Sequence, residues 1–500
     1  QKLLEAAGTG EWCRISPERP RENDKGPDNI IRAGFIRFLA LGGDEHAFVH
    51  EHGILLIGAW IEGALDLIGC KISKSLGLID CWFEETLGLL DASTKTIALS
   101  GSRMPGLDAN RLRSSGSVFL RHGFEARDKV RLHGARISGH LVCDGGTFRN
   151  ESDLALDAGG MDVAGSVLMR DGFEALGEVC LIAARIGADL DCSRGKFRNK
   201  KGDALCGQNL EVEGTFLLRD VETIEGSIDL SSARVEDLVD DAVSWAKADS
   251  LIIDGFNYDR VSGNAPTDYA NRKAWLLRQT PSHLAENFRP QPFEQLAKVL
   301  REMGHVEDAR RISILKQDYQ RRANWLQARQ RLDVANEKRS GETSVRQQFK
   351  GESAAARDLS GAAFRRLLGW GFKWTSGYGY RPIRALGGMA GLCVVGFFAF
   401  ALAYSSGVIV PAETRILVSK EWIGCADAEA TAQTDDGRPV SATKCWLHTA
   451  QGLDYPRFNA FWYSLDTFVP ILDLHQETAW MPQPERAEEG SWAGWARVYL

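Results

Sequence analysis

The chain has 500 residues, of which 44% are apolar and 25% charged, so it is long enough for two to four ordinary folded domains. Its formal net charge of −7 excludes a protein that is basic throughout, as general nucleic-acid binders are. The 51 glycines against 15 prolines favour many tight turns over disorder. Because the chain starts with Gln rather than Met, we expect the natural protein to extend further at this end.

Residues 1–50 are interpreted as an N-terminal helical cap. His46, His50 and His52 stand there at a spacing that metal ions can use, but no fourth ligand is evident, so no metal site is predicted. The sequence shows no secretory signal, no strand–GxGxxG–helix unit and no flavin, haem or catalytic constellation. We therefore expect no cofactor and no enzymatic activity.

Residues 51–260 are repetitive. Consecutive octets read LDLIGCKI from Leu65 and LGLIDCWF from Leu76, and the pattern returns as VRLHGARI, VCLIAARI and IDLSSARV. These last three octets start at Val130, Val179 and Ile228, at intervals of 49 residues. Positions 1, 3 and 8 are apolar and position 6 is small, which is the two-residue period of short strands separated by a turn.

Such short strands bury their apolar face only when they stack on copies of themselves, so we predict a β-solenoid with two octets in each coil. About sixteen octets give about eight coils, and a spacing of about 4.8 Å gives a length of about 38 Å. The pattern resembles the pentapeptide-repeat type of right-handed β-helix. The alternative, a β-sandwich with accidental repeats, is disfavoured by the regular recurrence. The predicted fold class is mainly β, followed by an α-helical connector and an α-helical transmembrane region.

One side of the rod is predicted to carry a basic stripe. Position 7 of every second octet reads Lys71, Ser93, Arg113, Arg136, Gly160, Arg185, Leu210 and Arg234. Five of these eight residues are basic, against two in the intervening octets. The stripe formed by Lys71, Arg113, Arg136, Arg185 and Arg234 is a candidate site for an anionic nucleotide or oligonucleotide. A solvated ladder of arginines paired with nearby acids is the alternative.

Residues 265–350 are predicted to form a helical hairpin or connector, with a break at Gly304 between two amphipathic segments. Thirteen Lys or Arg residues lie between Lys298 and Lys350 and lead into a basic, aromatic juxtamembrane segment at 351–384. That segment contains WTSGYGYRP, whose middle letters resemble a potassium-channel filter. It precedes the apolar span, and its Trp, Tyr and Arg residues are typical of a membrane-interface belt.

Residues 385–410 are predicted to form a transmembrane helix. The run from Ala385 to Tyr404 has 20 uncharged residues, enough to span about 30 Å of hydrocarbon, with a buried soluble helix as the alternative. Basic residues precede the span and none follows before Arg415, which places the solenoid in the cytoplasm and the loop 411–457 outside the inner (plasma) membrane. In that oxidising compartment Cys425 and Cys445 could form a disulfide.

Residues 458–482 contain WYSLDTFVPILDL, which resembles the pore helix and filter strand of potassium-channel-type pores. Thr467, Asp466 and Asp473 are the candidate pore-lining residues, and acidic rings would favour cations. The filter glycines are missing, so ordinary K⁺ selectivity is not expected. An interfacial helix without a pore is the alternative. Residues 483–500 could begin a second span, and we expect truncation at Leu500.

The octets, together with RPQPFEQLAKVLREMGHVEDAR, GYGYRP and WYSLDTFVPILDL, resemble a bacterial family of membrane proteins with an N-terminal pentapeptide-like solenoid. Its members are often labelled "membrane-associated oxidoreductase", a label that no motif in this chain supports. The resemblance extends to membrane effectors of antiphage systems, in which a cytoplasmic domain senses a nucleotide signal. We expect a homo-oligomeric pore in the lipid bilayer, gated by the solenoid. The alternative is a non-conducting, membrane-tethered scaffold or protein-interaction platform.

Overall fold

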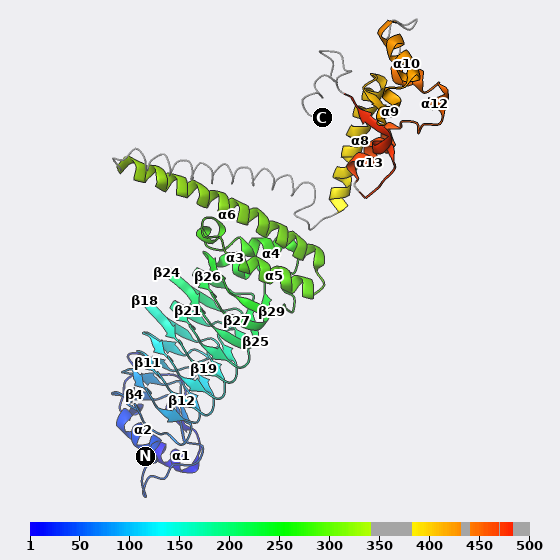
Figure 1. Cartoon of the computed structure of the whole chain (residues 1–500). Coiled ribbons are helices and arrows are strands. Elements are labelled where there is room, and N and C mark those ends of the chain that lie inside the picture. The colour runs from blue at the N-terminus through cyan, green and yellow to red at the C-terminus, as the bar shows by residue number, and fades with distance from the viewer. Residues whose placement is uncertain (342–382, 432–440, 470, 484–500) are drawn as a thin grey trace. The chain divides into compact units, whose positions relative to one another are not determined.

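The computed structural model describes residues 1–341, 383–431, 441–469 and 471–483 (Figure 1). The chain divides into two compact units, residues 1–363 and 364–500, which are described separately. Two sequence predictions, the juxtamembrane segment up to residue 382 with its WTSGYGYRP motif and the start of a second span at 484–500, lie outside the described residues.

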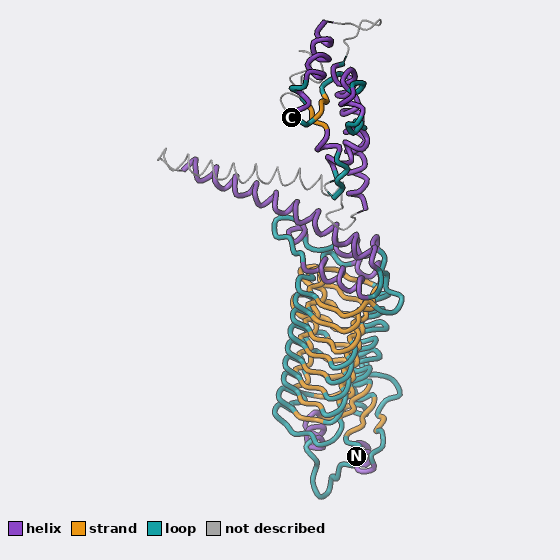
Figure 2. The backbone as a smooth tube through the Cα atoms, turned by 45° about the vertical axis from the view of Figure 1, so that its right-hand side comes forward, coloured by secondary structure: helices purple, strands orange, loops and turns teal. Residues whose placement is uncertain are grey.

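The first unit contains a β-solenoid of about nine turns with four faces, all built from parallel strand pairs (Figures 1 and 2). Face one comprises β1 (Cys13–Arg14), β3 (Ile54–Ile57), β5 (Leu76–Ile79), β9 (Ile97–Ala98), β13 (Val118–Phe119), β17 (Leu141–Val142), β20 (Val167–Leu168), β23 (Leu190–Asp191) and the second halves of β25 (Glu211–Leu218) and β27 (Arg234–Asp240). Face two comprises β2 (Ile30–Arg32), β4 (Trp60–Glu62), β6 (Trp82–Phe83), β10 (Arg103–Met104), β14 (Glu125–Ala126) and the first parts of β18 (Thr147–Asp157), β21 (Glu174–Cys180), β24 (Lys196–Cys206) and β26 (Thr223–Asp229).

The other two faces complete each turn. Face three comprises β7 (Leu87–Gly88), β11 (Leu107–Asp108), β15 (Val130–Arg131), the later parts of β18, β21, β24 and β26, and β28 (Leu251–Ile252). Face four comprises β8 (Ser93–Thr94), β12 (Arg113–Ser114), β16 (Arg136–Ile137), β19 (Asp162–Val163), β22 (Arg185–Ile186), the first parts of β25 and β27, and β29 (Asn257–Val261). One octet therefore covers two faces, and two octets make a coil, as predicted.

The register explains the 49-residue recurrence. Val118 pairs with Leu141, which lies 23 residues later, and Leu141 pairs with Val167, which lies 26 residues later. The next two coils repeat this alternation, since Val167 pairs with Leu190 and Leu190 with Phe216. The longer coils contain β18 and β24, strands of 11 residues whose register shifts where they pass from face two to face three. The repeat is thus a pair of unequal coils.

A continuous apolar core fills the solenoid and runs on into the helices that follow it. A ladder of four buried phenylalanines stacks along its interior, with successive ring centroids 5.5, 5.2 and 5.5 Å apart: Phe124, Phe148, Phe173 and Phe197. Phe124 and Phe173 occupy a corner of their coils, whereas Phe148 and Phe197 lie in the strand after a corner glycine. At Gly146 an added Cβ would lie 2.6 Å from the Leu120 carbonyl oxygen and 3.0 Å from the Phe148 ring. Alternate coils therefore contribute their phenylalanine to the same interior stack in two ways, from a corner residue or from the strand that follows a corner glycine.

The N-terminal segment forms more than the predicted helical cap. It contains α1 (Lys2–Thr9) and α2 (Ala33–Ala40), but β1 and β2 also pair in parallel with β3 and β4. These strands build a first turn that carries no recognisable octet, which is why the sequence predicts about eight coils and the structure has about nine.

Helices cover the other end of the solenoid: α3 (Ala242–Lys247), α4 (Tyr269–Leu276), the 3-10 helix η1 (Pro281–Leu284), α5 (Gln291–Glu302) and α6 (Val306–Gly341). The predicted hairpin is confirmed as α5 and α6, with Gly304 at φ +89° between them. Gln291 and Gln295 on α5 donate hydrogen bonds to the carbonyl oxygens of Phe256 (3.1 Å) and Tyr258 (2.6 Å) in the last coil. Side chains of α5 thus take over the hydrogen bonding that a further coil would supply.

A buried ion pair joins the helices α3 to α6, hereafter the helical cap, to the solenoid. Arg272 on α4 donates two hydrogen bonds, of 2.7 and 2.8 Å, to the carboxylate of Asp240 at the end of β27, and both side chains are at most 2% exposed. Trp245 on α3 donates its indole N–H to the same carboxylate at 2.6 Å. One carboxylate therefore holds α3 and α4 against the last coils.

The first described element of the second unit is α8 (Ile383–Ser405), a shorter helix than the predicted span to residue 410, because β30 (Ile409–Pro411) follows it. In the described residues, six short helices and a strand come next: α9 (Thr414–Leu417), α10 (Lys420–Thr431), α11 (Ala442–Trp446), α12 (Ala450–Leu453), α13 (Ala460–Phe468), α14 (Gln476–Ala479) and β31 (Trp480–Pro482). β31 pairs antiparallel with β30, so the chain returns to the end of α8 from which it departed.

Candidate functional site

Within the described residues, one helix is long and apolar enough to cross a membrane, the stretch Leu386–Ser405 of α8. Only 17% of it is buried, whereas a core helix of a soluble protein with the same composition would be mostly buried. Six large apolar side chains of this helix are exposed: Leu386, Leu392, Val394, Val395, Phe398 and Leu402. By length, composition and exposure, α8 suits a lipid environment.

Helix α13 packs antiparallel along the second half of α8. Phe458 stacks on Tyr404 and Tyr463 on Phe400, both with ring centroids 4.7 Å apart. At the next residue of α13, the Ser464 hydroxyl donates a hydrogen bond of 2.7 Å to the Cys393 carbonyl oxygen. A Cβ on Gly396 would lie 2.4 Å from the Ser464 hydroxyl, so this glycine allows the close approach of the two helices. The last turn of α13 therefore lies beside the middle of α8.

After α13 the chain turns back, and Asp466 organises the turn. The carboxylate of this buried residue accepts hydrogen bonds from the backbone N–H groups of Leu474 (2.8 Å), Gln476 (2.9 Å) and Glu477 (3.0 Å). The returning segment then enters β31, where Trp480 donates its indole N–H to the Pro456 carbonyl oxygen at 3.0 Å. The chain enters α13 near the C-terminal end of α8 and comes back to that same end in β31. This is the geometry of a re-entrant loop.

The three predicted pore-lining residues thus have different surroundings. Asp466 is occupied by the backbone of the turn, and Thr467 donates its hydroxyl to the Tyr463 carbonyl oxygen at 2.8 Å within α13. Asp473 is 74% exposed and contacts the ring of His475 at 2.6 Å. Of the three predicted pore-lining residues, Asp473 is therefore the exposed acidic side chain. The role of Asp466 as the acceptor for three N–H groups is not visible in the sequence, because its partners lie eight to eleven residues away.

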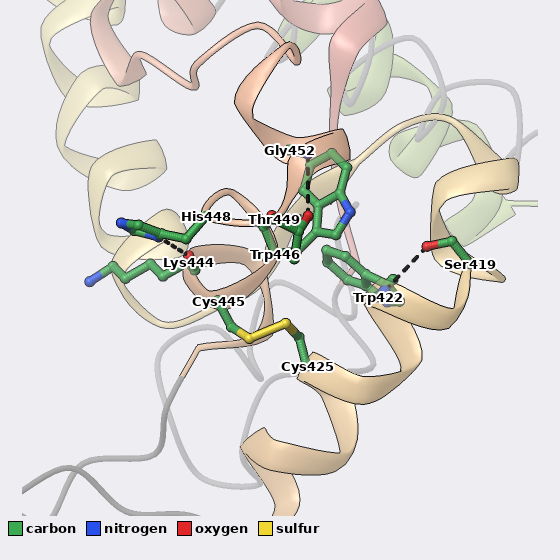
Figure 3. The surroundings of a disulfide bond; sticks show 9 residues. All are labelled: Ser419, Trp422, Cys425, Lys444, Cys445, Trp446, His448, Thr449 and Gly452. Atoms are coloured by element: carbon green, nitrogen blue, oxygen red, sulfur yellow. Dashed lines mark hydrogen bonds between the residues drawn. A yellow bond between two sulfur atoms is a disulfide. The ribbon is translucent and has the colours of Figure 1, made fainter.

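The loop between α8 and α13 is held by a disulfide between Cys425 on α10 and Cys445 on α11, the predicted pair (Figure 3). Beside it, Trp422 and Trp446 pack edge to face with centroids 5.8 Å apart, and both are buried. Gly452 allows α12 to approach the end of α11 closely, since a Cβ there would lie 2.1 Å from the Trp446 carbonyl oxygen. The disulfide and the tryptophans make a compact lobe in the segment between α8 and α13.

On face four of the solenoid, the predicted basic stripe is interrupted. The outward residues of successive coils, paired in register, are Lys71, Ser93, Arg113, Arg136, Asp162, Arg185, Glu211, Arg234 and Asn257. Asp162 and Glu211 face outward where the octet count placed Gly160 and Leu210. The extra residues of the two longer coils move the outward position along the sequence. All five predicted basic residues therefore lie on face four, but in its second half they alternate with carboxylates instead of Gly160 and Leu210.

The two halves of the stripe also differ in pairing. In the second half, Arg185 forms an ion pair with Glu211 at 3.2 Å, which is the solvated ladder that the sequence left as the alternative. In the first half, an elongated groove of about 550 Å³ lies along the coils and is lined by Lys71, Arg113 and Arg136. These three cations form no ion pair with any residue that the structure describes. The groove also contains Lys95, which the octet analysis missed because it lies two positions beyond the residue that was counted.

A second, smaller hollow of about 280 Å³ lies on face two, around the stacked rings of Trp60 and Trp82. Part of the N-terminal segment lies against this side of the solenoid, where Arg19 donates hydrogen bonds of 2.7 Å to the carbonyl oxygens of Gly101 and Gly123. Intramolecular contacts thus already occupy part of this side.

The histidines of the N-terminal segment take structural positions. The rings of His50 and His52 pack edge to face at 4.5 Å, and His52 Nδ1 lies 3.0 Å from the Gly10 carbonyl oxygen. A different group, Asp203, Cys206 and Asp229, brings potential ligand atoms within 4.8 Å of one another. Burial raises the pKa of the Cys206 thiol to about 12, which disfavours the thiolate that a metal needs. We assign no metal to either group.

Comparisons of this chain with models of known protein families, with curated proteins and with solved structures found no match.

Proposed function

We propose that this protein forms a homo-oligomeric membrane pore whose solenoid senses a cytoplasmic anionic ligand. The single observation that supports this most strongly is the re-entrant loop: α13 descends along α8, and the chain returns to the same end. A bilayer accepts such non-helical backbone only where protein or water-filled space surrounds it. Ion channels use this arrangement to place a short segment beside a conduction path.

The surface of the re-entrant loop supports assembly into an oligomer. Ile471 is 91% exposed, and other apolar side chains of the loop are also open to their surroundings: Phe461, Trp462, Phe468, Leu472 and Leu474. One loop encloses no channel, whereas a ring of identical subunits would enclose one and would cover part of this surface. In such a ring Asp473 would supply a circle of carboxylates and favour cations.

The proposed topology places the solenoid in the cytoplasm and the disulfide lobe outside the inner membrane. Five basic residues precede the span in the sequence: Arg365, Arg366, Lys373, Arg381 and Arg384. Positive charge of this kind stays on the cytoplasmic side. The disulfide between Cys425 and Cys445 suits an oxidising compartment on the opposite side, and the free cysteines of the solenoid suit a reducing one.

A ligand-gated pore of this kind would dissipate ion gradients when its signal appears, which is how a membrane-disrupting antiphage effector responding to a nucleotide would act. The solenoid would bind the ligand, and the helical cap would transmit the change toward the membrane. No catalytic step is required in this scheme.

Ion flux from proteoliposomes tests the proposal. Full-length protein reconstituted into K⁺-loaded liposomes is measured with and without ATP or tripolyphosphate on the solenoid side, and it is expected to release K⁺ above the leak of protein-free liposomes, faster when the anion is present. Asp473→Asn is expected to insert normally and to reduce the preference for cations over anions, because it removes the exposed charge. Correctly inserted protein that releases no ions under either condition would contradict the pore and favour the non-conducting scaffold.

A further inference from the structure

The first four coils of face four differ chemically from the four that follow. Each coil presents two outward residues there, one at the position already described and one two residues later. In the first four coils these are Lys71 and Ser73, Ser93 and Lys95, Arg113 and Ser115, and Arg136 and Ser138. In the next four they are Asp162 and Ala164, Arg185 and Gly187, Glu211 and Glu213, and Arg234 and Glu236. The first set has four cations and no carboxylate, whereas the second has two cations and four carboxylates.

The cations of the first set are available to a ligand. Lys71, Lys95, Arg113 and Arg136 are all exposed, and no ion pair holds any of them within the described part of the chain. Asp91, whose carboxylate also feels the charge of Arg113, is already engaged by Arg111 through two hydrogen bonds of 2.7 Å. The hydroxyls of Ser73, Ser93 and Ser138 likewise make no hydrogen bond to a described residue. Guanidinium, ammonium and hydroxyl donors together are the set that binds phosphate oxygens.

The size of the site limits the ligand. At about 4.8 Å between coils, four coils span about 14 Å, which suits a few phosphate groups and not a long strand. A longer polyanion continuing along face four would meet the carboxylates of Asp162 and Glu211. The groove is also lined without aromatic side chains, so it offers no surface on which bases could stack. Recognition there is of phosphate and not of base sequence.

We propose that the groove formed by the first four coils of face four binds a compact anion with several phosphate groups, such as a nucleoside triphosphate or an inorganic polyphosphate of similar length. This inference names the class of ligand that the solenoid would sense. Only the consequence of binding, the opening of a pore, rests on the proposed function. Binding is measured without ion flux, so the failure of one proposal is distinguishable from the failure of the other.

The test uses the full chain in detergent and two variants with the same change in charge. Arg113→Ser combined with Arg136→Ser removes two unpaired cations, and Arg185→Ser combined with Arg234→Ser removes two arginines from the acidic half of the same face. Inorganic tripolyphosphate and ATP are titrated calorimetrically into each protein. The first variant is expected to bind about 10- to 100-fold more weakly, and the second within about twofold of the parent. Comparison of the two probes shows whether the nucleoside contributes.

A third variant, Asp162→Ser, is expected to bind tripolyphosphate more tightly, since it removes the carboxylate next to Arg136, and misfolding does not produce a gain. The proposal is overturned if the parent protein binds neither probe, or if both double variants lose affinity equally. It is also overturned if long single-stranded oligodeoxythymidine binds more tightly than tripolyphosphate and its binding depends on Arg185 and Arg234.

Discussion

Replacing Asp240 by Ala is expected to destabilise the end of the solenoid by about 3–5 kcal/mol, because it leaves the buried Arg272 guanidinium without its partner. The side chains of both residues are at most 2% exposed, and the Trp245 indole N–H loses its acceptor as well. Amides of β27 and β29 are then expected to exchange with solvent deuterium at least about 100-fold faster, whereas those of β12 keep their protection.

Paired apolar replacement provides the control. Asp240→Leu combined with Arg272→Met removes both charges, and buried ion pairs replaced in this way often lose little stability. The double variant is expected to exchange more slowly in β27 and β29 than the Asp240→Ala variant. If Asp240→Ala leaves the exchange of both strands unchanged, the carboxylate is not what holds the helical cap to the last coils.

Replacing Asp466 by Ala is expected to abolish ion flux, because three backbone N–H groups of the return segment lose the carboxylate that accepts them. A hydrogen bond to a charged group contributes about 1.5–3 kcal/mol, and an unsatisfied N–H group is more costly away from water. Flux from proteoliposomes is measured together with the fraction of protein that remains monodisperse in detergent.

Asp473→Ala is the matched control, since it removes the same functional group from the same segment. The Asp473 carboxylate is exposed and contacts His475, two residues away, so its loss is expected to leave the fold of the loop intact. Residual flux in the Asp466→Ala variant equal to that of the Asp473→Ala variant would show that Asp466 does not organise the conducting segment.

The sequence predicts the elements whose residues repeat or whose partners are close in the chain. The octet rule identifies inward residues such as Leu65, Leu67 and Ile72, all of which are buried. Helical spacing with Gly304 as a break identifies α5 and α6. The cysteine pair is predicted from the charge-based topology, which places Cys425 and Cys445 on the opposite side of the membrane from the cysteines of the solenoid, and the structure joins these two in a disulfide.

The sequence does not predict features that depend on the register between coils. The longer coils place Met161 and Leu210 directly before the outward residue, where most octets have a small residue, and Asp162 and Glu211 face outward. Cys13–Arg14 and Ile30–Arg32 join the solenoid without octets, because pairing with the next turn decides their conformation. The serines of the groove could in part be found from the sequence. Ser93 occupies position 7 of an octet, and Ser73, Ser115 and Ser138 each lie two residues after such a position.

Side-specific thiol labelling tests the central claim, that α8 crosses the bilayer and α13 enters it and returns to the same side. Ser406→Cys, Thr478→Cys and Ser138→Cys are introduced one at a time into the full chain. Intact spheroplasts are treated with a membrane-impermeant maleimide, and the labelled site is identified by mass spectrometry. We expect Ser406→Cys and Thr478→Cys to be labelled from outside, and Ser138→Cys only after permeabilisation. Labelling of Thr478→Cys only after permeabilisation, or of Ser138→Cys in intact spheroplasts, would contradict the account.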